Sequence, residues 1–95
     1  DAQLEAAIYK ATRKHALYSY NISNITTAGF EPILYPEDQA ELDSMVQLNS
    51  EYSKKVLLEH MASKMAVNKN LQSSYLGLYK KRLETYRLIA TMGKR

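Results

Sequence analysis

The N-terminal part of the chain keeps its apolar residues on one side of a helix for three heptads. Successive seam positions are separated by alternating steps of four and three residues, and they are Leu4, Ile8, Ala11, His15, Tyr18, Ile22 and Ile25. This is the a/d spacing of a helix that packs lengthwise against another helix. The spacing predicts an N-terminal helix over residues 1–25 and, because the seam needs a helical partner, an all-α fold.

Residues 26–36 are predicted to form an extended connector. Two threonines, a glycine and two residues that precede proline disfavour helix here, namely Thr26, Thr27, Gly29, Glu31 and Tyr35. Gly29 is free to adopt a positive φ, which we expect at the end of the first helix. The connector also contains the apolar residues Phe30, Ile33, Leu34 and Tyr35. It should therefore pack, either on the chain's own helices or against another subunit.

Residues 37–95 are predicted to form a long helical region, because Pro36 suits the first turn of a helix and no proline follows it. We expect helix from about 37 to 92, with residues 48–50 as the place of any break. At ~1.5 Å per residue, residues 50–92 alone would extend about 63 Å. A chain of 95 residues buries only a thin core, so we expect one elongated domain.

The apolar stripe of the long helical region is interrupted by polar residues. Its apolar members are Leu57, Met61, Met65, Leu71, Tyr75, Tyr79, Leu83, Tyr86 and Ile89. Asn68 and Gln72 fall inside the stripe, and a polar residue there lowers stability but can fix the register of two helices. The alternative is that Asn68 lies where the interface is wet. The predicted fold is an elongated antiparallel pair of coiled-coil-like N- and C-terminal helices joined by the connector.

The net charge of +3 is unevenly distributed along the chain. Residues 31–59 hold seven of the ten acidic residues, whereas residues 60–95 hold eight basic residues and one acidic residue. This asymmetry fits a nucleic-acid surface, head-to-tail complementarity between subunits, or solvated helix faces. No nucleic-acid-binding motif accompanies the basic residues, so we expect no nucleic-acid partner. No apolar run approaches the roughly 20 residues that cross a bilayer, so we expect no membrane span.

Residue types used in catalysis and metal binding are present but are not grouped in the sequence. His15 and His60 are 45 residues apart, and neither has a nearby partner at metal-ligand spacing. We therefore expect packing or solvent contact for both. The acidic cluster at residues 37–43 lacks the central glycine of an EF-hand loop. Without cysteine, a glycine-rich phosphate loop or a nucleophile elbow, we expect no enzyme activity, cofactor or metal.

The end of the first helix and the turn after it form a short motif. Its residues are Asn21, Ile22, Asn24, Thr27, Gly29 and Phe30. The motif resembles the N-terminal signature of bacterial flagellar axial proteins, the rod, hook and hook-associated subunits, which has a pattern like S-N-N-I-A-N-x-N-T-P-G-[FY]. The chain departs from that pattern at Tyr20, Ser23, Thr26, Ala28 and Glu31. Because Ala28 stands at the proline position, the turn should be less stiff.

The long helical region extends the resemblance. Residues 65–72, followed by Tyr75, Leu78, Leu83, Tyr86 and Ile89, look like the C-terminal helix of the proximal rod proteins. The resemblance covers residues 2–31 and about 58–92. In that family a longer segment, often with some β-structure, separates the two helices. The chain therefore resembles a short or divergent rod protein, or a related junction protein of the export apparatus.

The resemblance implies a structural subunit of the flagellar basal-body proximal rod, part of the drive shaft. It implies self-assembly through the terminal helices, other rod or export-gate proteins as partners, and type III export to the periplasm-spanning rod without a cleaved signal. The residues expected at assembly contacts are Leu4, Ile8, Ala11, Tyr18, Asn21, Ile22, Asn24, Ile25, Gly29, Phe30, Met61, Met65, Asn68, Tyr75, Tyr79, Tyr86 and Ile89. The alternative is a helical-hairpin adaptor whose seam receives a partner's amphipathic helix.

Overall fold

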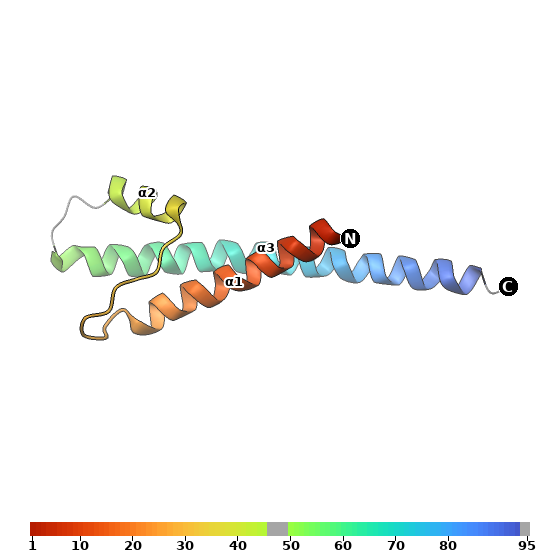
Figure 1. Cartoon of the computed structure of the whole chain (residues 1–95), viewed down its shortest axis with the longest axis horizontal. Helices are drawn as coiled ribbons and strands as arrows, with labels where there is room; N and C mark the ends of the chain where they lie inside the picture. Colours follow the sequence, from red (N-terminus) through yellow and green to blue (C-terminus); the bar gives the residue numbers. More distant parts are fainter. Residues whose placement is uncertain (46–49, 94–95) are drawn as a thin grey trace.

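The computed structural model describes residues 1–45 and 50–93, which form three helices (Figure 1). They are α1 (Ala2–Asn24), α2 (Pro36–Met45) and α3 (Ser50–Met92). No strand occurs in the described residues. The predicted all-α fold is confirmed, and none of these helices is long and apolar enough to cross a membrane.

α1 and α3 lie side by side and run in opposite directions (Figure 1). Residues paired along their length are Asn21 with Met61, Ala11 with Asn68, and Asp1 with Arg82. The molecule measures 69 × 24 × 17 Å. The predicted elongated antiparallel pair is therefore confirmed, and α3 continues beyond the N-terminus of α1.

α2 folds back along the N-terminal half of α3 instead of continuing into it (Figure 1). Its Leu42 is buried in one cluster with Tyr18 of α1 and Met61 of α3. The helical region expected over about 37–92 is therefore present as two helices, α2 and α3. Folding back places Leu42 in the core and brings the acidic residues of α2 to basic residues of α1 and α3. Of the residues 48–50 where a break was possible, 48 and 49 lie outside the described residues, and Ser50 is the first residue of α3.

The main hydrophobic core is a small cluster where the three helices and the connector meet. Met61, Tyr18 and Leu42 are its buried members, and Met61 is fully buried. The partly buried residues packed against them are Ile22, Leu34, Val56, Leu57 and Met65. The α3 residues of this cluster all come from the N-terminal half of that helix, so the tightest packing lies there.

Asn21 fastens the connector to α1. Its side chain is fully buried, its Nδ2 donates to the carbonyl of Ile33 at 2.7 Å, and its Oδ1 accepts from the backbone N–H of Ile33 at 3.0 Å. Nearby, the Phe30 ring meets the Tyr20 ring edge-to-face at 5.6 Å. The connector thus packs on the chain's own helices, which is one of the two arrangements that its apolar residues predict.

The starts of α1 and α2 follow from the residues at those positions. Asp1 caps α1, because its Oδ1 accepts the backbone N–H groups of Gln3 and Leu4 at 2.9 and 3.2 Å. α2 begins at Pro36, the position where a fixed φ and a missing N–H are tolerated.

Gly29 adopts a positive φ of 73°, as expected, but it does not end α1. The helix ends at Asn24, and Gly29 lies in the later turn in which the Phe30 N–H donates to the Thr27 carbonyl at 3.1 Å. The expected role of Gly29 at the C-terminus of α1 is therefore corrected. Gly29 sets the direction of the connector in the turn that follows the end of α1.

We predict that Gly29→Ala lowers the free energy of unfolding by about 1–2 kcal/mol, because alanine is strained in the left-handed region. Apart from Gly29 and its two chain neighbours, no residue has an atom within 4 Å of the position that a Cβ would occupy, so the cost comes from φ alone. Gly29→Val should cost more, since valine is also stiff at χ1. Urea denaturation followed by far-UV circular dichroism measures both.

Gly77→Ala is the matched control, because Gly77 lies inside α3, its added Cβ also meets open space, and its φ is not positive. This change should stabilise the chain by about 1 kcal/mol through helix propensity. A Gly29→Ala chain that is as stable as the unchanged chain would contradict the assigned strain.

Candidate assembly interface

The seam of α1 is covered within the chain. Leu4, Ala11 and Tyr18 are buried, and the other apolar seam positions, Ile8, Ile22 and Ile25, are half-buried. α3 and the connector supply the covering surface, with Leu42 of α2 at Tyr18. The sequence is therefore right that this seam needs a helical partner, and the chain itself provides that partner.

The matching seam of α3 is more polar than the predicted stripe. Asn68 is buried, and Gln72 donates from Nε2 to the Thr12 hydroxyl at 3.0 Å. Leu71 and Leu83, which the stripe included, are exposed. The seam passes through their neighbours Gln72 and Arg82, because one residue turns a helix by about 100°. Of the other predicted contacts, Met61 is buried, and Met65, Tyr75 and Tyr79 are half-buried.

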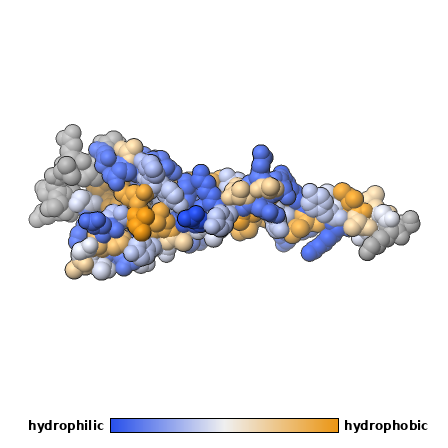
Figure 2. Space-filling view, viewed as in Figure 1, coloured by the Kyte–Doolittle hydropathy of each residue, from blue (hydrophilic) through white to orange (hydrophobic). Residues whose placement is uncertain are grey.

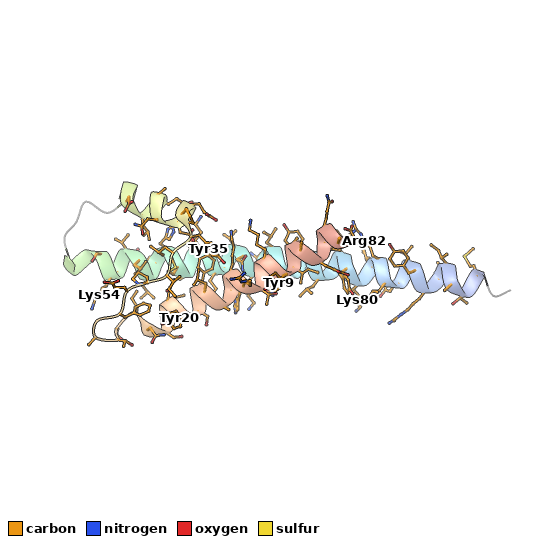
Figure 3. The ribbon with its side chains drawn as sticks, viewed as in Figure 1. Tyr9, Tyr20, Tyr35, Lys54, Lys80 and Arg82 are labelled. Atoms are coloured by element: carbon orange, nitrogen blue, oxygen red, sulfur yellow. The ribbon has the colours of Figure 1, made fainter. Side chains whose placement is uncertain are left out.

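Asn68 makes a directional contact across the two helices. Its Nδ2 donates to the backbone carbonyl of Ala11 at 2.8 Å, and the side chain is buried. Such a bond is satisfied at one alignment of α1 on α3, so it favours that register over its neighbours. This supports register fixing over a wet interface at this position. At the far end of the pair, Arg82 lies beside the start of α1 and pairs with Asp1 (Figure 3).

The last ten residues of α3 form an overhang that α1 does not reach. All residues from 83 to 92 are exposed, and the large apolar ones are Leu83, Tyr86, Leu88, Ile89 and Met92. Figure 2 shows apolar surface toward this end of the molecule. Tyr86 and Ile89, two of the predicted assembly residues, therefore lie on an apolar helix end without an α1 residue beside it.

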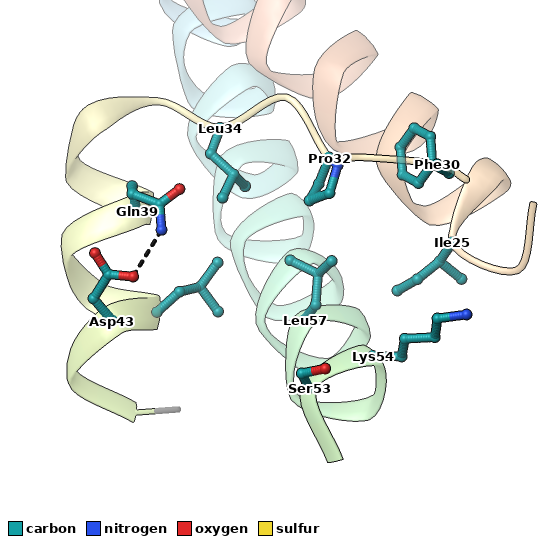
Figure 4. A pocket seen from close by; sticks show the side chains of 10 residues that line it. Ile25, Phe30, Pro32, Leu34, Gln39, Asp43, Ser53, Lys54 and Leu57 are labelled. Carbon is teal, nitrogen blue, oxygen red and sulfur yellow. Dashed lines mark hydrogen bonds between the residues drawn. The ribbon is translucent and has the colours of Figure 1, made fainter. Parts of the chain in front are cut away.

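An apolar pocket of about 580 Å³ lies at the opposite end of the long axis (Figure 4). Ile25, Phe30, Pro32 and Leu34 line it from the end of α1 and the connector. The residues that line it from α2 and α3 are Gln39, Leu42, Asp43, Ser53, Lys54 and Leu57. Ile25 and Phe30 belong to the predicted assembly residues, while the α2 side of the pocket arises from the fold-back.

A polar cluster joins α2 to α1 and α3. Asp38 is buried and accepts the Tyr18 hydroxyl at 3.2 Å, and His60 lies 3.8 Å from it. Lys64 donates to Glu41 at 2.9 Å. Burial, reinforced by the Asp38 carboxylate, raises the pKa of Tyr18 well above its usual value. The hydrogen bond between Lys64 and Glu41 lowers the pKa of Glu41 and raises that of Lys64.

This cluster corrects the expectation that His60 has no partner at ligand spacing. The sequence separates His60 from Asp38 and Glu41, and the fold-back of α2 brings the three together. The signal present in the sequence was the one-turn spacing of Asp38 and Glu41, which places both carboxylates on one helix face. His15, by contrast, is half-buried on the α1 seam.

Some of the acidic residues in the segment 31–59 pair with basic residues of the same chain. Glu37 of α2 lies 3.5 Å from Lys14 of α1, and Glu41 pairs with Lys64 of α3. The acidic segment therefore docks on basic positions of its own helices. Comparison with protein-family models, with curated proteins and with solved structures finds no match for the chain.

We predict that Asn68→Leu raises the free energy of unfolding by about 1 kcal/mol while it relaxes the register of α1 on α3. Leucine adds apolar burial, and the Ala11 carbonyl keeps its own intrahelical bond, but the directional contact is lost. Urea denaturation measures the first effect. The nuclear magnetic resonance spectrum measures the second, because each register present in slow exchange gives its own set of amide signals.

Gln72→Leu is the control on the same seam, because Gln72 bonds to a side-chain hydroxyl and is only half-buried. It should leave a single register, seen as one set of amide signals. An Asn68→Leu chain that keeps one set of signals and is less stable than the unchanged chain would show that Asn68 acts as an ordinary hydrogen-bond donor.

Proposed function

We propose that the chain is a structural subunit of a bacterial flagellar basal-body rod, which assembles through the ends of its two terminal helices. The observation that carries the proposal is the overhang of α3, where Tyr86, Leu88, Ile89 and Met92 are exposed. Exposed apolar helix surface of this kind is typical of a contact with another molecule.

The position of the two uncovered apolar surfaces supports a polymer. The overhang and the pocket lie at opposite ends of a molecule 69 Å long. A contact between two different surfaces is heterologous, and repetition of such a contact gives a ring or an open helical tube. A rod needs the open form of this arrangement.

The resemblance to flagellar axial proteins gains support from the local roles of its residues. Asn21 fastens the connector, and Asn24 bonds to the Tyr20 carbonyl at 2.9 Å at the end of α1. Gly29 supplies the positive φ, and Phe30 packs on Tyr20. Each of these motif positions thus has a physical reason to carry its residue type, namely the exit of the chain from α1.

A second candidate function is an adaptor that binds an amphipathic helix of another protein. The pocket favours it, because a cavity of about 580 Å³ with an apolar lining is large enough to receive bulky side chains of a partner helix. Self-association separates the two candidates: the rod proposal requires it, and the adaptor does not.

We predict that the purified chain associates as its concentration rises and that Ile89→Asp prevents this association. A charge at a desolvated contact costs several kcal/mol, whereas an exposed position in the monomer tolerates it. The helix content of the monomer should therefore be unchanged. Sedimentation velocity over a range of concentrations, with circular dichroism in parallel, measures both.

Val67→Asp is the matched control, because Val67 is equally exposed on α3 but lies outside the overhang. It should associate like the unchanged chain.

In the bacterium of origin, deletion of the gene should abolish swimming, and the Val67→Asp gene but not the Ile89→Asp gene should restore it. A fully motile deletion strain would refute the rod function, and a chain that stays monomeric would refute assembly through the overhang.

A further inference from the structure

His60 faces two carboxylates of α2 across the contact between α2 and α3. Its Nε2 lies 3.8 Å from Asp38 Oδ1 and 3.8 Å from Glu41 Oε2. The His60 side chain is only 6% exposed, and Nε2 is buried without a hydrogen-bond partner. A separation of 3.8 Å is too long for a hydrogen bond. A neutral imidazole with its proton on Nδ1 would present, together with the two carboxylates, three electron-pair donors to the space between them.

The two carboxylates are each held by their second oxygen. The Tyr18 hydroxyl donates to Asp38 Oδ2 at 3.2 Å, and Lys64 donates to Glu41 Oε1 at 2.9 Å. Asp38 Oδ1 and Glu41 Oε2 are thereby directed toward His60. Metal ligands are oriented by outer hydrogen bonds of this kind.

We propose that Asp38, Glu41 and His60 bind one divalent transition-metal ion of the zinc type, with water as a further ligand. The three ligand atoms lie within 4.8 Å of one another. Bonds of about 2.0–2.2 Å in a tetrahedral site place ligands roughly 3.4 Å apart, so shifts of about an ångström in the side chains complete the site. One imidazole nitrogen with two oxygens favours Zn²⁺ over Mg²⁺, which prefers oxygen ligands alone.

Access and charge balance fit this assignment. The Glu41 side chain is half-exposed, so an ion and its water can reach the buried His60 from that side. Lys64 is 4.0 Å from Asp38 Oδ1 and partly exposed, and its flexible stem lets the ammonium turn away from Asp38 Oδ1 while it keeps its hydrogen bond to Glu41 Oε1. The bound ion would tie α2 to α3 and stabilise the fold-back. The site lies within one chain and does not depend on the proposed rod assembly.

Isothermal titration calorimetry of the untagged, chelator-treated chain with Zn²⁺, and separately with Mg²⁺, tests the proposal. We expect one Zn²⁺ per chain and no binding of Mg²⁺. His60→Gln and Asp38→Asn should weaken Zn²⁺ binding by more than the roughly 10–100-fold that loss of an outer partner causes, while Tyr18→Phe should fall within that range. His15→Gln, which changes the other of the two histidines, is the control and should bind as the unchanged chain does.

A second measurement needs no variant. The ring resonances of His60 in the nuclear magnetic resonance spectrum should shift on addition of one equivalent of Zn²⁺, and those of His15 should not. Absence of Zn²⁺ binding to the folded chain, equal binding by His60→Gln, or a shift confined to His15 would each overturn the proposal.

Discussion

The burial of Met61 is the interaction on which the rest of the structure depends. It brings together Tyr18 of α1, Leu42 of α2 and Met61 of α3, three segments that are far apart in the sequence. α1 and α3 meet at Tyr18 and Met61, and α2 covers the same place with Leu42. A buried methionine of this kind contributes about 1.5–3 kcal/mol. Packing weakens from this cluster toward the C-terminal end of α3, so local stability should fall in the same direction.

Buried polar side chains fix how α1, α2, α3 and the connector are positioned relative to one another. In the described residues, the buried polar or charged positions are Asn21, Asp38, His60 and Asn68, and they are nearly as numerous as the buried hydrophobic ones. Hydrogen bonds between such groups contribute little net stability, but leaving one unpaired is costly. Each therefore disfavours alternative arrangements: Asn68 fixes the register of α1 on α3, Asn21 fixes the connector, and Asp38 fixes the position of α2.

The sequence predicts α1 and its seam well, because seven positions keep one strict spacing. It predicts α3 less well, since the stripe included Leu71 and Leu83, which are exposed, together with Gln72, which does face α1. The fold-back of α2 is not predicted, because neither glycine nor proline occurs between residues 37 and 76. The proximity of His60 to Asp38 depends entirely on that fold-back, so no local spacing could reveal it.

The unequal lengths of the helices determine where the chain has surface left for a partner. α1 has 23 residues and α3 has 43, so no antiparallel pairing of the two covers all of α3. α2 covers part of the excess at one end, and the overhang remains at the other. In the proposed assembly, two overhangs in contact would bring together Arg87 and the neighbouring Lys80 and Lys81 of both copies. A head-to-tail contact would instead bring these basic residues toward the acidic residues of α2 in a neighbour, so charge would favour the heterologous arrangement.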